Sequence, residues 1–133
     1  MNARMTWLGL IVVGCLLGVS GVLAVEHTKD SLAVVKQKLA DKSAVLVDVR
    51  EQAEWDAGHL DAAILLPLSG LQKGTDSSQK LKKGTIVYTH CKAGVRSVTA
   101  GEILAKQGYD VRPLKAGYQD LLDAGFAPAK KKK

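Results

Sequence analysis

Apolar segments of strand length alternate with segments of helical periodicity along most of this chain. Runs rich in β-branched residues predict buried strands, and apolar residues spaced three or four apart predict helices. We therefore expect strands at residues 44–50, 63–67, 86–88 and 109–114, and helices at residues 28–40, 51–57, 97–107 and 118–124. This alternation predicts an α/β fold, in which a parallel sheet is flanked by helices on both faces.

Several residues in this pattern mark where the expected elements begin or end. Thr28 is expected to cap the first helix, and Gly108 is expected to end the helix over residues 97–107. Residues 70–84 are polar and rich in lysine, so we expect a surface connection with room for one helical turn.

Residues 1–24 have a different character from the rest of the chain. They carry one charged residue, Arg4, and they end in Val22–Ala24, which resembles the small-residue cleavage site of a secretory signal peptide. We expect cleavage after Ala24 and export, with the bacterial periplasm as the destination. The alternative is a retained anchor in the inner membrane over residues 8–25, a stretch barely long enough to span it.

The two cysteines of the chain lie in different surroundings. Cys15 lies in the apolar N-terminal segment. Residues 12–15 resemble the box that precedes the acylated cysteine of bacterial lipoproteins, but the apolar run that continues after them disfavours this interpretation. Once the segment is removed, Cys91 is the only thiol, so no intramolecular disulfide can form. An unpaired cysteine in an oxidising compartment is either well buried or kept for its reactivity.

The excess of positive charge is confined to the two ends of the chain. The formal net charge is +6, and Arg4 together with the four terminal lysines supplies five of these charges. The domain that we expect over residues 28–128 is therefore close to neutral, which argues against a nucleic-acid partner. The lysine tail, residues 129–133, is expected to be a solvated end, with weak attraction to an anionic membrane as the alternative.

The strongest candidate for chemistry is Cys91. It follows a predicted strand and precedes a short loop, which contains Gly94 and leads into a predicted helix. The free N–H groups of a helix start and the charges of Lys92 and Arg96 all favour a thiolate. We therefore predict that Cys91 is a nucleophile. The competing interpretation is that it is a small buried apolar residue.

Several separated motifs together indicate a family. They are Val47–Glu51, Glu54–Trp55, Gly58–Leu60 followed by Ala63 and Pro67, the loop Cys91–Ser97, Leu114–Gly117 and Ala124–Phe126. In this order and at these distances they resemble a single-domain rhodanese, of the thiosulfate sulfurtransferase family, over about residues 28–128. Two positions depart from the family pattern. Ala116-Gly117 replaces a glycine pair, and Leu121 replaces a tryptophan, which bears on packing beside the loop.

The resemblance implies a rhodanese-like fold and a thiosulfate sulfurtransferase activity. Cys91 would attack the outer sulfur of an anionic donor such as thiosulfate, release sulfite, and pass the sulfur from a persulfide to cyanide or a thiol. This exchange at sulfur requires no general base, and we expect no metal and no cofactor. The loop residues expected to bind the substrate are Lys92, Ala93, Gly94, Val95 and Arg96. We expect Lys92 to meet the donor anion, and Arg96 to hold the loop by forked hydrogen bonds.

Other polar residues receive structural interpretations. Asp48 and Arg50 are expected to form a structural pair near the loop. His59 follows a turn glycine and is expected to be structural. His90 precedes Cys91 on an extended segment, so its ring should face away from the thiol. Nothing in the sequence supports a role for His27.

Two alternative functions remain open at this stage. His90-Cys91 followed by Arg96 and Ser97 also resembles the loop of cysteine phosphatases and of the arsenate reductases related to them. Those loops place one residue more between cysteine and arginine, which disfavours this alternative. The other alternative is a non-catalytic persulfide carrier or sulfur-binding module for a partner protein, in which the same thiolate would serve.

Overall fold

The computed structural model describes residues 24–131. Its strands are β1 (Ala44–Asp48), β2 (Ala63–Leu65), β3 (Ile86–His90) and β4 (Asp110–Pro113). Its helices are α1 (Leu32–Ala40), α2 (Gln52–Ala57), α3 (Leu68–Gln72), α4 (Val95–Lys106) and α5 (Tyr118–Asp123). The predicted export segment lies outside the described residues except for Ala24. Within the described part, no helix has the length and apolarity needed to cross a membrane.

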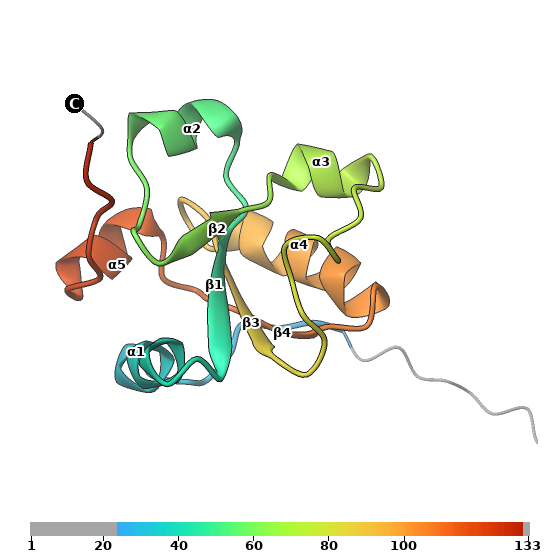
Figure 1. Cartoon of the computed structure of the whole chain (residues 1–133), viewed down its shortest axis with the longest axis horizontal. Helices are drawn as coiled ribbons and strands as arrows, with labels where there is room; N and C mark the ends of the chain where they lie inside the picture. Colours follow the sequence, from blue (N-terminus) through green and yellow to red (C-terminus); the bar gives the residue numbers. More distant parts are fainter. Residues whose placement is uncertain (1–23, 132–133) are drawn as a thin grey trace, which may run out of the picture.

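The four strands form one parallel sheet in the order β2-β1-β3-β4. Helices α1 and α5 lie on one side of this sheet, and α3 and α4 lie on the other (Figure 1). This arrangement confirms the predicted α/β fold. Because β1 and β3 are the two inner strands, both of their carboxyl ends lie in the middle of the sheet edge, where ligands bind in folds of this kind.

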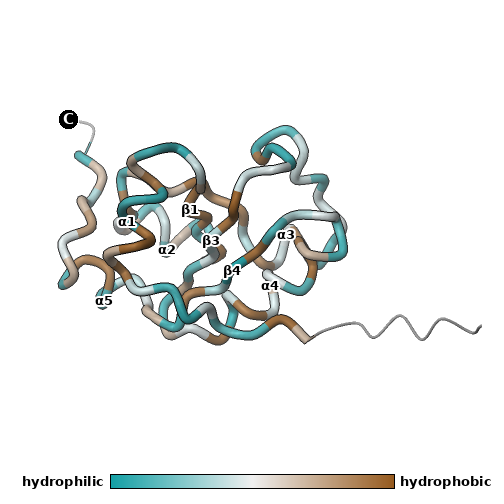
Figure 2. Tube along the Cα trace, turned by 90° about the horizontal axis from the view of Figure 1, so that it is seen from below, coloured by the Kyte–Doolittle hydropathy of each residue, from teal (hydrophilic) through white to brown (hydrophobic). Residues whose placement is uncertain are grey.

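The sheet separates two hydrophobic cores, because successive residues of a strand point to opposite faces. Leu46 and Tyr88 belong to the core under α1 and α5, whereas their neighbours Val47 and Val87 belong to the core under α3 and α4. All four are fully buried. Figure 2 shows hydrophobic residues along β1, whereas many residues of the loops around the sheet are hydrophilic. The near-continuous apolar strands of the sequence are thus explained by burial on both faces.

The first helix begins later than predicted. Its N-cap is Ser31, whose Oγ accepts a hydrogen bond from the N–H of Val34 at 3.3 Å. The prediction that Thr28 caps this helix is wrong, because its hydroxyl instead accepts a bond from the N–H of Asp30 at 3.1 Å. The N–H of Thr28 donates to the carbonyl of Pro113 at 2.7 Å, which ties this segment to the end of β4.

Helix α4 begins two residues earlier than predicted, at Val95. Gly94 forms its N-cap in the left-handed conformation, with φ of 86°. At the other end Gln107 is the C-cap, and Gly108 follows with φ of 92°. The early start places Arg96 in the first helical turn, where its charge opposes the helix dipole.

The one helical turn expected in the polar connection lies at its very beginning. Helix α3 starts at Leu68, before the expected segment of residues 70–84, because Leu68 and Leu71 are buried in the core beneath α4.

The C-terminal segment is also held in place. Leu60 and Pro128 form an antiparallel bridge, and this bridge brings the chain end back beside the turn that follows α2.

Candidate active site

Cys91 lies directly after β3, at the carboxyl end of an inner strand. The residue is only 1% exposed, and it is the free cysteine of the described part of the chain. Its Sγ accepts a hydrogen bond from the N–H of Gly94 at 3.1 Å, and its carbonyl accepts one from Tyr118 at 2.9 Å. The thiol is therefore held at the start of α4 by the backbone of its own loop.

Two glycines allow the loop to approach the segment before α5. A Cβ at Gly94 would lie 2.6 Å from the carbonyl oxygen of Lys115, and a Cβ at Gly117 would lie 1.8 Å from that of Lys92. Neither distance is compatible with a side chain, and Gly94 also needs its positive φ. The departure from the family pattern at Ala116 thus leaves intact the glycine that makes the close contact.

A buried hydroxyl ties the loop to the rest of the domain. Ser97 Oγ lies 2.8 Å from the carbonyl oxygen of Gly94 and 2.9 Å from that of Leu114. The carbonyl of Ser97 in turn accepts a bond from Thr89 Oγ1 at 2.8 Å. These bonds satisfy polar groups that are buried at the start of α4, and they fix the loop relative to β3 and the end of β4.

The structure brings Asp48 and Arg50 together beside the loop. Arg50 Nε donates to Asp48 Oδ1 at 3.0 Å, and Arg50 Nη2 donates to Oδ2 at 2.7 Å. Nη2 also donates to the carbonyl of Gly58 at 2.8 Å, while the guanidinium lies 4.1 Å from the centre of the Tyr118 ring. The pair therefore joins β1, the turn after α2 and the start of α5.

Arg96 forms forked hydrogen bonds, as the sequence led us to expect. Their acceptor, however, is not the loop. Its Nη1 and Nη2 donate to the two carboxylate oxygens of Glu54, at 2.7 and 2.8 Å. A carboxylate matches the guanidinium fork better than separate carbonyls do, and the bonds are charge-assisted. The prediction of the partner was therefore wrong, and Glu54 was missed. Its position three residues after Glu51 could signal a helix start, but not a partner in α4.

The charged forms of Glu54 and Arg96 stabilise each other. The hydrogen bonds from Arg96 lower the pKa of Glu54 to about 2. The pKa of Arg96 is raised, chiefly by the hydrogen bonds to Glu54 and to a smaller extent by the charge of Cys91. The ionised forms of both side chains are therefore favoured in the folded protein.

The remaining predicted loop residues lie at the surface. Lys92, Ala93 and Val95 are exposed, Val95 to 74%. A pocket of about 380 Å³ lies beside the loop, and Lys92, Arg50 and Glu54 are among its lining residues. Lys92 is thus placed where it can meet a small anion, whereas no contact of the side chains of Ala93 or Val95 supports a binding role.

The two internal histidines are held by structural contacts. His90 is fully buried, with Nε2 lying 3.6 Å from Asp48 Oδ2 and Nδ1 lying 3.4 Å from the carbonyl oxygen of Cys91. Burial lowers the pKa of His90, which favours the neutral ring. His59 stacks on Trp55 with ring centres 3.6 Å apart, and its Nδ1 lies 3.0 Å from the carbonyl oxygen of Trp55.

His27 contacts the loop, although the sequence supports no role for it. Its Nε2 lies 2.7 Å from the carbonyl oxygen of Gly94, so the ring nitrogen donates this bond. The carbonyl therefore accepts bonds from both His27 and Ser97. No sequence signal predicts this contact, because 67 positions separate the two residues and no motif joins them.

The site contains no arrangement that suggests a metal centre. Among residues 24–131, no group of three or more His, Cys, Asp or Glu side chains is placed to hold a metal ion. What the site offers is a thiol at a helix start, a backbone N–H bonded to its sulfur, and two cations beside it. These features suit nucleophilic chemistry at Cys91.

A parallel α/β domain with a cysteine loop at the end of an inner strand defines the class of this protein. The model of the rhodanese-like domain matches residues 31–124, and the chain belongs to this family. Human single-domain sulfurtransferase TSTD1 is a structural neighbour, with a TM-score of 0.63 and 25% identity. The match covers 71% of this chain and 94% of the human one.

Two curated relatives carry names from sulfur chemistry. The "Putative thiosulfate sulfurtransferase, mitochondrial" of Schizosaccharomyces pombe is 33% identical over an alignment of 84 residues, and the match covers 56% of this chain and 59% of that protein. The "Putative sulfur carrier protein YrkF" of Bacillus subtilis is 32% identical over 80 residues, 59% of this chain and 42% of that protein. The chain thus matches only part of each relative, and both sulfurtransferases and sulfur carriers are among its homologues.

Proposed function

We propose that this protein is a sulfurtransferase that carries sulfur as a persulfide on Cys91. The Cys91 thiolate attacks the outer sulfur of thiosulfate or a similar donor, and the new S–S bond forms as the old one breaks. Sulfite leaves with the electron pair of the broken bond. A thiolate or cyanide then attacks the outer sulfur of the persulfide, and Cys91 departs as a thiolate.

The observation that carries this proposal is the hydrogen bond from Gly94 N–H to Cys91 Sγ at 3.1 Å. A donor N–H at a helix start stabilises a negative charge on sulfur, both in the attacking thiolate and in the departing one. Arg96 lies in the first turn of the same helix and adds a positive charge, although Glu54 pairs with its guanidinium. Membership of the rhodanese-like family supports the same chemistry.

The decisive experiment is the intact mass of the protein after exposure to thiosulfate. We expect the mass to rise by one sulfur atom, and to fall back when cyanide is added. Cys91→Ser should show neither change and no thiosulfate:cyanide transfer, with an unaltered circular dichroism spectrum. Transfer by Cys91→Ser would overturn the proposal. Hydrolysis of an aryl phosphate without sulfur loading would instead support the phosphatase alternative.

Lys92 is proposed to attract the donor anion. Its side chain is exposed and lines the pocket beside the loop, so it acts as a point charge and not as part of the loop scaffold. We expect Lys92→Ala to raise the KM for thiosulfate roughly three- to tenfold with little change in kcat. Lys106→Ala, at the exposed end of α4, is the matched control. Equal KM values for the two variants would remove Lys92 from donor binding.

A persulfide carrier is the second candidate, since the sulfur of a carrier must be shielded and Cys91 is 1% exposed. The name of the Bacillus subtilis relative also supports it. Multiple turnover with thiosulfate and cyanide distinguishes an enzyme from a carrier that loads once and keeps its sulfur.

We also propose that residues 1–24 direct export, and the same mass measurement on protein from whole cells tests for a cut after Ala24.

A further inference from the structure

Cys91 is buried, although the proposed reaction requires its sulfur atom to meet a donor. The residue is only 1% exposed, and Sγ accepts a hydrogen bond from the N–H of Gly94 at 3.1 Å. Attack on thiosulfate brings two sulfur atoms into direct contact. An element beside the loop must therefore move before Cys91 is loaded, and again before its persulfide is discharged.

Helices α2, α4 and α5 border the Cys91 loop, and they differ in how firmly they are packed. Helix α4 continues from the loop and buries Ala100 and Leu104, and α5 buries Leu121. Helix α2 buries none of its six residues. Because a segment that buries little apolar surface opens at a low cost in free energy, α2 is the element that moves most easily.

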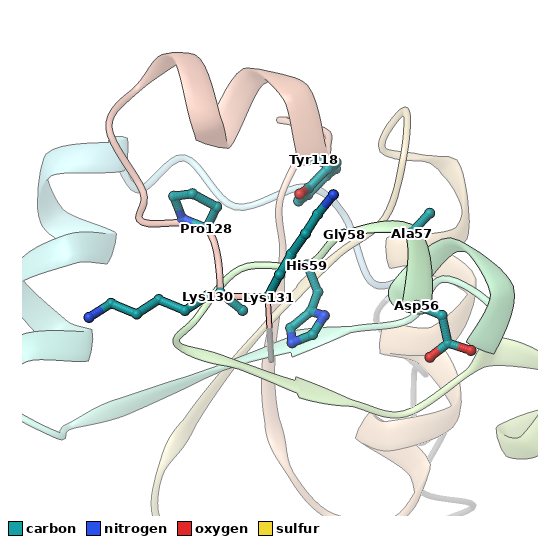
Figure 3. Close-up of a pocket in the computed structure, with 9 residues that line it drawn as sticks. Asp56, Ala57, Gly58, His59, Tyr118, Pro128, Lys130 and Lys131 are labelled. Atoms are coloured by element: carbon teal, nitrogen blue, oxygen red, sulfur yellow. The ribbon is translucent and has the colours of Figure 1, made fainter. Parts of the chain in front are cut away.

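Two pockets border α2. Asp56 and Ala57 line a pocket of about 830 Å³, and Glu54 and Ala57 line the pocket of about 380 Å³ beside the loop. Figure 3 shows Asp56 and Ala57 on one side of the larger pocket and Pro128 on the other. Side chains that face open space lack packing partners there. Helix α2 can therefore shift without displacing the rest of the domain.

The side-chain contacts that hold the body of α2 against its neighbours are polar and reached by solvent. Glu54 binds Arg96, in the first turn of α4, at 2.7 and 2.8 Å. Glu51, the N-cap of α2, accepts a hydrogen bond from Ser69 Oγ of α3 at 2.6 Å. Exposed contacts of this kind each contribute little free energy, so they break and re-form readily.

The base of α2 is fixed by a contact that joins its two ends. Arg50 lies directly before the N-cap and is buried. Its Nη2 donates to the carbonyl of Gly58, the C-cap, at 2.8 Å. Residues 51–57 therefore form a flap that can swing out while both of its ends stay in place.

We propose that residues 51–57 form a lid that controls access to Cys91 and is closed by Arg96 and Ser69. Its role in sulfur transfer rests on the proposed function of Cys91. The lid opens to admit the sulfur donor, closes over the persulfide, and opens again for the acceptor. While it is closed, it keeps water and unrelated thiols away from the persulfide.

The test measures how fast iodoacetamide, a small neutral reagent, alkylates Cys91 in the full-length protein. The mass of the peptide that contains Cys91 reports the reaction. Ser69→Ala removes one contact that closes the lid, so alkylation should be roughly two- to tenfold faster than in the wild type. Ser78→Ala is the control and should match the wild type, because Ser78 Oγ donates to Asp76 at 2.8 Å outside the lid. Glu54 is left unchanged, since its loss also changes the charge beside Cys91.

Two further measurements distinguish opening of the lid from unfolding of the domain. The N–H of Trp55 and that of Leu121 donate to the N-cap carbonyls of α2 and α5, at 3.1 and 3.0 Å. We expect Trp55 to exchange its amide hydrogen roughly tenfold faster, because only α2 is free to open. Low concentrations of urea should change the alkylation rate of Cys91 little, since opening the lid exposes little new surface.

Equal alkylation rates in Ser69→Ala and Ser78→Ala overturn the lid, and so does equal exchange at the two matched amides or a steep rise of alkylation with urea. Each of these results leaves the proposed function standing if thiosulfate still loads Cys91. Faster alkylation in Ser69→Ala of a Cys91 that thiosulfate never loads overturns the sulfur transfer and leaves the lid.

Discussion

Two arginine–carboxylate pairs flank the Cys91 loop, and they differ in exposure to solvent. The side chains of Arg50 and Asp48 are 6% and 0% exposed, whereas those of Arg96 and Glu54 are 31% and 32% exposed. Both pairs are bidentate, with shortest N–O distances of 2.7 Å. The same chemical contact is thus used once inside the domain and once at its surface.

This difference in exposure assigns the two pairs different roles. Removing one member of a buried pair leaves a charge without solvent or partner, which is strongly destabilising. A surface pair is screened by water, so it contributes little to stability. The Asp48–Arg50 pair therefore holds the scaffold beneath the loop. The Glu54–Arg96 pair instead controls where a positive charge lies relative to Cys91.

The largest expected effect comes from breaking the buried pair. Asp48→Asn removes the charge that faces Arg50 while keeping the size of the side chain. We expect the free energy of unfolding to fall by about 3–5 kcal/mol, measured by urea denaturation. Asp123→Asn, at an exposed carboxylate that accepts a bond from Gln119, should change it by less than about 0.5 kcal/mol. Similar losses in both variants would show that burial of the Asp48 carboxylate does not raise its contribution to stability.

The two pairs also show what the sequence can and cannot predict. Asp48 and Arg50 are two positions apart at the end of an apolar strand, so their proximity to each other and to the strand end follows from the local pattern. Glu54 and Arg96 are 42 positions apart, and their contact depends on how α2 sits above the sheet edge. Local patterns of polarity carry no information about that packing.

The positions of the helices and strands were also predictable only where they depend on local sequence patterns. Strand positions were predictable because burial on both faces makes β1 and β3 almost continuously apolar. The start of α1 was misjudged because Thr28 and Ser31 are both good capping residues, and the bond from Thr28 to Pro113 decides between them. The position of Cys91 at a strand end was predictable, whereas its near-complete burial was expected only under the competing interpretation of a small apolar residue.

An intermediate effect is expected from breaking the exposed Glu54–Arg96 pair. Glu54→Gln keeps one acceptor for Arg96 but removes the charge and the matched fork. We expect a loss of less than about 1 kcal/mol in stability, because both side chains are about one-third exposed, yet a roughly three- to tenfold slower loading of Cys91. The measurements are urea denaturation and single-turnover loading by thiosulfate. Arg96→Lys should slow loading similarly, since lysine keeps the charge but cannot form the fork.

Low pH should weaken the Glu54–Arg96 pair. The pKa of Glu54 is lowered from 4.5 to about 2, so the folded state favours the ionised form. Its contribution to stability is fully present above about pH 4.5 and is lost as the pH falls toward 2. The stability difference between wild type and Glu54→Gln should therefore shrink across this interval. A difference that stays constant over the interval would contradict the assignment of the shift to this pair.

The smallest expected effect concerns His27, whose contact with the loop is made at the surface. His27→Ala removes the bond to the carbonyl of Gly94, but that carbonyl keeps its bond from Ser97. We therefore expect a roughly two- to threefold slower loading of Cys91, since one net hydrogen bond is worth about 1 kcal/mol at most here. Single-turnover loading measures this effect, and Lys29→Ala, an exposed neighbour on the same segment, is the control.

Removing residues 1–27 should slow loading as much as His27→Ala does, if the His27 ring acts only through its bond to the carbonyl of Gly94. A cut after Ala24 would leave His27 as the third residue of the chain, and the next residue, Thr28, is held to Pro113 at 2.7 Å. A protein that starts at Thr28 should therefore load as slowly as His27→Ala and no more slowly. Trimming also removes the residues before His27 and turns the Thr28 N–H into an α-ammonium group. A much larger loss would therefore mean that one of these further changes also acts on the loop.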